Sequence, residues 1–210
     1  MLLYLIIGAF VLYKVYSIVF NKQKKEIGNM AEKEIIRELR KEIPRARVFQ
    51  SVYVDIPGGK TEVDIVALDK TGIYVIESKN YSGKIEGDIG LKFWRYKHLG
   101  GKQFTFYNPV WQNRTHVNAI KYQLKLKQSQ LVSYVVFGKK SEIGKIKGQT
   151  DVRVLRVQQV RDCLKHDMNG RGTVFSEREL KELESWFRSG TRVGIFTKMK
   201  HIMDVKRKAA

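Results

Sequence analysis

The segment 61–80, TEVDIVALDKTGIYVIESKN, most constrains what this chain can fold into. Two apolar runs rich in Val, Ile and Tyr flank the turn signal Asp69-Lys70-Thr71-Gly72, which predicts two antiparallel strands joined by a tight turn. Side chains alternate between the two faces of a strand. Asp64 and Glu77 therefore share a face with apolar residues, so this hairpin carries acidic groups where a plain hairpin would be apolar.

The register of the hairpin decides which charged groups meet. If the hairpin is symmetric about the centre of its turn, Asp64 lies opposite Glu77 and Glu62 lies opposite Lys79. Opposed Cβ atoms would then be roughly 5 Å apart. A bulge in the turn would shift each pairing by one residue.

Two carboxylates held side by side above an apolar floor repel each other and lose hydration, so Asp64 and Glu77 require a positive charge between them. The candidate is a divalent cation with oxygen ligands, Mg²⁺ or Mn²⁺. Lys79 shares their face and would direct an ammonium at the same point, toward a phosphate or an attacking water. The alternative is a solvated ladder of cross-strand charges that includes Glu62, and the spacing alone favours neither.

A helix is predicted over 29–43, where apolar residues recur at helical spacing and Pro44 marks the end. Glu32 lies on the same side as this apolar stripe, which directs its carboxylate toward the core. Asn29 and Glu32 also have the spacing of a capping box, in which Glu32 would serve the terminus of its own helix. The pattern leaves both roles open.

A second helix is predicted from Asn108-Pro109 to about residue 125. Gln112 and His116 are four residues apart on it and face the same way. An amide and an imidazole in that position can orient a phosphate or a water near the acidic groups. Alternatively, both are ordinary surface or capping residues.

Length and charge limit the class of protein. The chain of 210 residues is long enough for one α/β domain with appendages. Its formal net charge of +19 and sequence pI of about 10.0 favour contact with a polyanion, either nucleic acid or anionic lipid, although a Lys-rich solvated surface has the same composition. Cys163 is the only cysteine, which excludes an intramolecular disulfide and a cysteine-rich zinc site.

Residues 2–20 are apolar apart from Lys14 and are long enough to cross a hydrocarbon core. We therefore expect a transmembrane anchor over 1–21, followed by a basic juxtamembrane linker over 22–27. The basic residues follow the apolar run, which places the rest of the chain on the cytoplasmic side of the cell membrane. A cleaved signal peptide fits less well, because its charged region would precede the apolar run.

The C-terminal part of the domain is predicted over 127–190 and the tail over 191–210. Within the first, buried strands are expected at 131–137 and 152–157, and helices at 158–166 and 176–188. The tail combines an apolar stripe with many Lys and Arg residues. Such a helix can lie on anionic lipid or follow a nucleic-acid backbone, and a solvated tail is the alternative.

Several short patterns occur in one order between residues 28 and 124. They are Gly28-x-x-Ala31-Glu32, Glu62-Val63-Asp64-Ile65, Gly72-Ile73-Tyr74-Val75-Ile76-Glu77-Ser78-Lys79-Asn80, Gly83, Trp94 and Asn108-Pro109-x-x-Gln112-Asn113-x-x-His116. Together they resemble the nuclease-related domain family, NERD, which is regarded as a branch of the PD-(D/E)xK phosphodiesterase superfamily. The resemblance implies an α/β fold of restriction-endonuclease-like type over residues 28–126, with a central mixed β-sheet flanked by helices.

The resemblance also implies a role for each charged residue of the pattern. Asp64 and Glu77 would correspond to the metal ligands, Lys79 to the catalytic lysine, Glu32 to a carboxylate on the first helix and Gln112 to the glutamine that follows the core. Two positions depart from the family: Ala31 stands where Gly is frequent, and Ile65 stands where many members have His. Neither change removes a charged group, so the expected site is complete and only its fine specificity is affected.

The expectation is a membrane-anchored phosphodiesterase that uses Mg²⁺ or Mn²⁺ to cut DNA in preference to RNA. One alternative is a membrane-tethered module of the same fold that binds nucleic acid or a partner without cutting. Another is a membrane-associated structural protein whose basic tail binds lipid. Carboxylates that repel phosphate have no evident use in a pure binding protein, which favours the enzyme.

Overall fold

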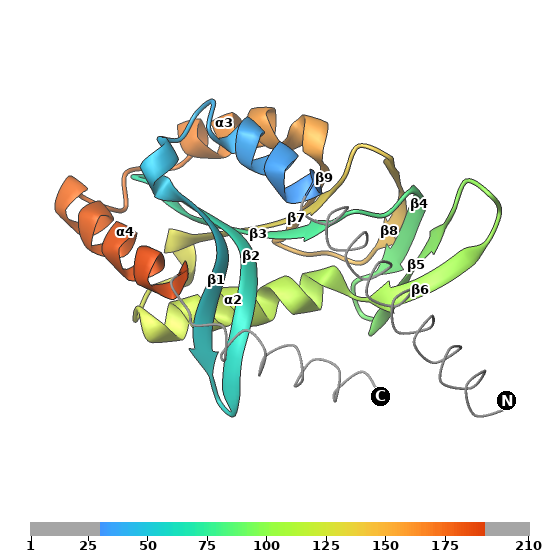
Figure 1. The fold of residues 1–210 in the computed structure, drawn as a ribbon, viewed down its shortest axis with the longest axis horizontal. Helices are drawn as coiled ribbons and strands as arrows, with labels where there is room; N and C mark the ends of the chain where they lie inside the picture. Colours follow the sequence, from blue (N-terminus) through green and yellow to red (C-terminus); the bar gives the residue numbers. More distant parts are fainter. Residues whose placement is uncertain (1–29, 192–210) are drawn as a thin grey trace, which may run out of the picture.

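The computed structural model describes residues 30–191 and shows two mixed β-sheets with helices against them (Figure 1). The strands are β1 Val48–Ile56, β2 Gly59–Asp69, β3 Gly72–Lys79, β4 Gly83–Asp88, β5 Phe93–Lys97, β6 Gln103–Tyr107, β7 Leu131–Phe137, β8 Ser141–Lys147 and β9 Arg153–Arg156. The helices are the helical residues 30–39, α2 Pro109–Gln123, α3 Val160–Gly170 and α4 Glu177–Thr191. Short 3-10 turns lie at Arg45–Arg47, Gln128–Gln130 and Val157–Gln159.

The larger sheet has the strand order β1-β2-β3-β7-β9, with antiparallel pairs from β1 to β3 and parallel pairs from β3 to β9. Helices α2 and α4 cover one face, and helix 30–39 and α3 cover the other (Figure 1). In α4, residues Leu180, Leu183 and Phe187 are buried, as expected for apolar positions three and four apart. The prediction of an α/β domain with helices on a mixed sheet is confirmed.

The architecture differs from the prediction in one respect: a second sheet is present beside the central one. It has the order β6-β5-β4-β8 and packs on its own apolar cluster around Trp94 and Phe106. Strand β8 was not predicted, since its sequence SEIGKIK mixes Lys, Gly and Ile without a clean alternation. It forms because β4 provides a parallel partner, which sequence periodicity does not reveal.

The predicted hairpin register is confirmed along the paired part of β2 and β3. The opposed residues run from Asp69 and Gly72 at the turn to Ile65 and Ile76, and no bulge shifts them. Asp64 and Glu77 are the next residues of their strands in this register. The ladder of paired residues ends at Ile65 and Ile76, so β2 leaves β3 at the point where the two acidic residues lie.

The pairing of Glu62 with Lys79 was wrong, because β1 and β2 change faces together just before this point. Val63 and Val66 are three residues apart yet enter the same apolar cluster, and Phe49 and Val52 do the same on β1. Between them Ser51 adopts a left-handed φ of 53°, an uncommon conformation for a residue other than Gly. Simple alternation of side chains between the two faces therefore fails for the residues of β2 that precede Asp64.

Two predicted segments lie outside the described residues: the membrane anchor with its linker, 1–27, and most of the tail, 191–210. Within residues 30–191 no helix is both long and apolar enough to cross a membrane. The two strands and two helices predicted within 127–190 are confirmed, since β7, β9, α3 and α4 form close to their expected bounds. The Ser176 capping box is also present, with the Ser176 amide donating to Glu179 Oε2 at 2.7 Å.

Candidate active site

A buried ion pair forms the centre of the site, where the end of β3 lies against the first turn of α2. Lys79 Nζ donates to Glu77 Oε1 at 2.5 Å and to Gln112 Oε1 at 2.9 Å. The Glu77 side chain is 1% exposed and that of Lys79 is 17% exposed. The structure thus brings three of the predicted residues into direct contact, and it excludes a solvated charge ladder.

His116 holds the second oxygen of Glu77. Its Nε2 lies 3.1 Å from Glu77 Oε2, and its Nδ1 lies 3.0 Å from Thr61 Oγ1. Both contacts are buried, so Thr61 and Glu77 together set the orientation of the imidazole ring. The sequence placed His116 beside Gln112 but did not assign it to the site. The signal that supports its assignment is its spacing of one helical turn from Gln112.

Thr61 was missed for a physical reason. Alternation along β2 puts Thr61 on the opposite face from Asp64, and only the change of faces turns it toward α2. The same change turns Glu62 away, where its carboxylate accepts a hydrogen bond from the Tyr53 hydroxyl at 2.7 Å.

Asp64 lies next to the ion pair on the neighbouring strand. Its Oδ2 accepts a hydrogen bond from the backbone amide of Ser78 at 2.8 Å. The Asp64 side chain therefore accepts a hydrogen bond from a β3 backbone amide at the point where regular pairing between β2 and β3 has ended. This contact holds the Asp64 carboxylate against the backbone of the residue that follows Glu77.

Burial and charge move the pKa values of the two carboxylates in opposite directions. Burial, and then the charge of Glu77, raise the pKa of Asp64 well above its usual value, and Lys79 and the Ser78 amide only partly offset this. Burial also disfavours ionisation of Glu77, but Lys79 and His116 outweigh it and lower its pKa. The pKa of Lys79 is raised, because Glu77 and Asp64 outweigh the cost of its burial. The cluster therefore holds two carboxylates, one buried and one partly buried, and a single lysine.

Glu32 approaches from the other face of the sheet, and the structure does not bring it into contact with the ion pair. Its carboxylate accepts a hydrogen bond from Gln50 Nε2 at 2.5 Å. Burial raises its pKa, and the charges of Glu62 and Glu77 raise it further, which places Glu32 at the margin of the acidic cluster. The capping-box alternative involves Asn29, which lies outside the described residues.

The start of α2 is held in place by Asn108. Its side chain accepts from the amides of Val110 and Trp111 as an N-cap, and its Nδ2 donates to Leu91 O at 2.8 Å. Pro109 fills the first helical position, where no amide donor is needed. This clamp ties the helix to the second sheet and so fixes where Gln112 meets Lys79.

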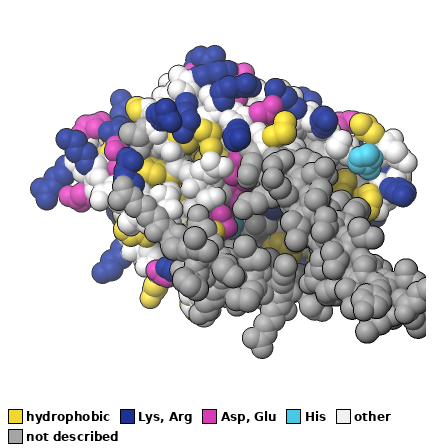
Figure 2. All heavy atoms as spheres, viewed as in Figure 1, with side chains coloured by type: hydrophobic (Ala, Val, Ile, Leu, Met, Phe, Trp, Pro, Cys, Tyr) yellow, Lys and Arg dark blue, Asp and Glu magenta, His cyan; other side chains and the backbone are white. Residues whose placement is uncertain are grey.

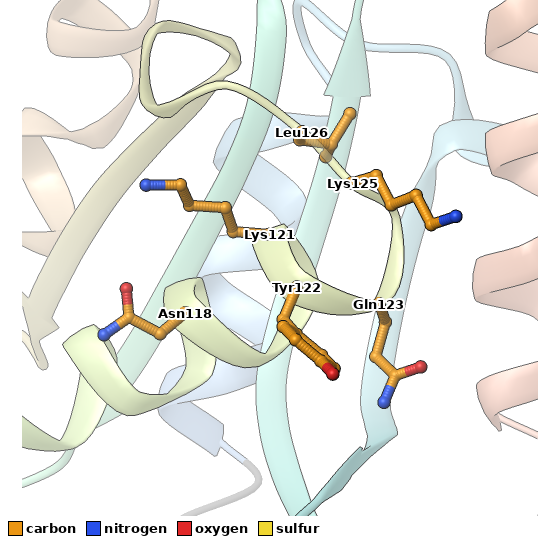
Figure 3. A pocket seen from close by; sticks show the side chains of 6 residues that line it. All are labelled: Asn118, Lys121, Tyr122, Gln123, Lys125 and Leu126. Carbon is orange, nitrogen blue, oxygen red and sulfur yellow. The ribbon is translucent and has the colours of Figure 1, made fainter.

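A hollow on the surface lies at the other end of α2 and holds none of the site residues. Figure 3 shows its lining side chains, which come from the last turns of α2 and the following loop: Asn118, Lys121, Tyr122, Gln123, Lys125 and Leu126. It contains no acidic group and is open to solvent. We therefore assign no catalytic chemistry to it.

Comparison with known proteins identifies the family of this chain. The model of the nuclease-related domain family matches residues 27–138, more than half of the chain and the whole of the site just described. The chain belongs to this family. The match spans the strands and the helix that carry Asp64, Glu77, Lys79 and Gln112.

A curated relative extends the similarity beyond the family model. An uncharacterized protein of Bacillus anthracis is 28% identical over 158 residues, which cover 73% of each chain. Its name states no activity. No solved structure matches this chain significantly.

Proposed function

We propose that this member of the nuclease-related domain family hydrolyses phosphodiester bonds in nucleic acid, with DNA as the expected substrate. The observation that carries the proposal is the buried Lys79–Glu77 pair with the Asp64 carboxylate beside it. A partly buried acidic residue with a raised pKa beside an ion pair is costly for stability, so such groups are concentrated at functional sites. A module that only binds phosphate has no use for this excess negative charge.

The donor set fits a divalent cation such as Mg²⁺ or Mn²⁺ that keeps several of its waters. Asp64 and Glu77 would hold it, and within residues 30–191 no group of three or more His, Cys, Asp and Glu side chains is placed to hold a metal ion. Mg²⁺ is commonly bound through one or two carboxylates together with substrate phosphate. When bound, the ion would supply a Lewis acid for the phosphate and a more acidic water.

The other residues of the site act on charge and position. The Lys79 ammonium would offset negative charge that develops on the phosphate, and Gln112 would keep that ammonium in place through its Oε1. Glu32, at the margin of the cluster, would add negative potential for the cation.

The charge of the surface suits this substrate. Figure 2 shows Lys and Arg side chains over the upper edge and left end of one face, around helix 30–39, α3 and α4. Such a surface would give salt-dependent affinity for phosphates that is independent of base sequence.

The test is cleavage by the full chain, purified in detergent because residues 2–20 are apolar. We expect it to cut circular single-stranded DNA or supercoiled plasmid with Mg²⁺ or Mn²⁺ and to stop cutting when EDTA is added. Parallel reactions with RNA report the preference for DNA. If DNA and RNA are bound but neither is cut with any divalent cation, the tethered binding module replaces the enzyme.

His116→Ala should lower cleavage by about 10–100-fold, because an outer partner that orients a ligand carboxylate is typically worth that much. Without the imidazole, Glu77 keeps Lys79 but loses the contact that fixes its second oxygen. The rate should be measured over a range of Mg²⁺ concentrations, since loss of orientation raises the concentration needed for half-maximal rate.

Thr61→Val is the matched variant for this prediction. It keeps the shape of the side chain and removes only the contact to His116 Nδ1, so a smaller effect in the same direction is expected. If His116→Ala cuts at the full rate at low Mg²⁺, the positioning role of His116 is wrong.

A further inference from the structure

Exposed apolar side chains of the described residues are concentrated on one hairpin. Of the large hydrophobic residues that are exposed, five of seven lie between positions 91 and 107, on or beside β5 and β6: Leu91, Phe93, Leu99, Phe104 and Tyr107. Figure 2 shows hydrophobic side chains at the right end of this face, where Figure 1 draws the tip of the hairpin. They divide between the two faces of the hairpin, because Phe93 and Tyr107 face one way and Phe104 faces the other.

Three aromatic rings form a row along the inner side of this hairpin. Tyr81 stacks on Tyr96 with ring centroids 4.6 Å apart, and Tyr96 stacks on Phe104 with centroids 5.2 Å apart. Both pairs have an interplanar angle of 21°. Tyr81 and Tyr96 are partly buried, while Phe104 at the end of the row is 45% exposed. Tyr96 covers one face of the Phe104 ring, and much of the remainder is open.

The row begins at the active site. Tyr81 follows Lys79 by two residues, and Lys79 pairs with Phe137 on the neighbouring strand β7. Both Tyr81 and Tyr96 pack against Phe106, which in turn contacts Phe137 on β7, the strand beside β3. The row therefore leads from the catalytic cluster to the exposed ring of Phe104.

The chain is strongly basic where it forms β5, β6 and α2. No Asp or Glu occurs between Asp88 and Glu142, a stretch that includes β5, β6 and α2 and carries Lys and Arg throughout. On the outer side of the sheet one acidic residue, Glu86, lies opposite Arg95. A basic segment that also presents aromatic rings favours a ligand that carries both negative charge and flat apolar groups.

We propose that the row of Tyr81, Tyr96 and Phe104 binds unpaired bases of a single-stranded nucleic acid and leads its phosphate backbone to Lys79. This inference rests on the proposed function, because it places the row beside the reacting phosphate. Stacking on an aromatic ring requires a base with a free face, which a single strand offers and a duplex interior does not. The Lys and Arg residues of this segment suit the backbone phosphates that connect such bases.

The test measures binding, so that it does not depend on cleavage. The full chain in detergent carries Asp64→Asn and is titrated, in EDTA, into a fluorescent single-stranded DNA oligonucleotide and into its duplex. Adding Phe104→Ala should weaken single-strand binding about ten-fold, the scale of one lost stacking contact, and change duplex binding much less. Phe104→Tyr keeps the ring and should bind like the parent.

Two further variants locate the effect. Phe93→Ala removes an exposed ring from the other face of the same hairpin, and Tyr122→Ala removes one that is 82% exposed at the far end of α2. Both should bind the single strand within about two-fold of the parent, as ordinary surface changes do. A loss in Phe93→Ala as large as that in Phe104→Ala would overturn the proposed location.

The outcomes also separate this inference from the proposed function. Equal weakening of single-strand and duplex binding by Phe104→Ala would overturn the single-strand preference, whether or not the parent chain cuts DNA. If the parent chain cuts nothing but Phe104→Ala still weakens only single-strand binding, the inference stands and the nuclease proposal fails. If Phe104→Ala binds the single strand as tightly as the parent and has the same melting temperature, the inference that the row binds bases is wrong.

Discussion

Asp64→Asn should abolish cleavage and leave the fold as stable as before, or more so. The substitution removes a negative charge from the cation site, and a lost contribution of several kcal/mol to charge stabilisation corresponds to about a thousand-fold in rate. The carboxamide oxygen can still accept the hydrogen bond from the Ser78 amide. Burial and the charge of Glu77 raise the pKa of Asp64, which means that its ionised form destabilises the folded state at neutral pH. A neutral side chain removes that penalty.

Two measurements check this prediction: the rate of DNA cleavage with Mg²⁺ and the midpoint of thermal unfolding in EDTA. Glu62→Gln is the matched control, because Glu62 lies two residues earlier on β2 and contacts Tyr53 on the other side. It should retain cleavage. A lower melting temperature in Asp64→Asn, or cleavage as fast as in Glu62→Gln, would contradict the account of Asp64 as a strained ligand.

Lys79→Met should cost both activity and stability. Loss of the ammonium removes a charge aimed at the phosphate, and removal of one such donor lowers rates by roughly 10²–10³-fold. The same change leaves Glu77 almost fully buried without its ion-pair partner. Breaking a buried pair from one side typically destabilises a protein by about 3 kcal/mol or more. The combined loss distinguishes Lys79 from Asp64, whose replacement costs activity but no stability.

A double substitution separates the two effects of Lys79. Glu77→Gln together with Lys79→Met removes both charges, so we expect urea unfolding to show most of the lost stability restored. Cleavage should stay absent, since a ligand and the ammonium are both missing. Stability of the double variant equal to the sum of the two single losses would show that the pair does not act as a unit.

Local patterns predicted the hairpin and its chemistry because strand alternation and turn symmetry act over short distances. The register from Asp69 and Gly72 to Ile65 and Ile76 follows from the turn alone, and it brings Asp64 and Glu77 to neighbouring positions. The helical spacing of Gln112 and His116 likewise predicted that both face one way. These relations need no knowledge of the rest of the chain.

The same reasoning failed where one strand's course depends on another. The left-handed backbone at Ser51 shifts β1 and β2 together, which moves Glu62 away from Lys79 and turns Thr61 toward His116. Strand β8 forms because β4 offers a parallel partner, and the second sheet therefore escaped prediction.

By itself, the sequence determined that this chain forms an α/β domain, that its hairpin places two carboxylates and a lysine on one face, and that its surface is strongly basic. Tertiary structure alone decided that Glu77 is buried between Lys79 and His116, and that a row of aromatic rings extends from Lys79 to Phe104. The reason is that burial and pKa depend on packing between α2, β3 and the second sheet, which are distant in the sequence.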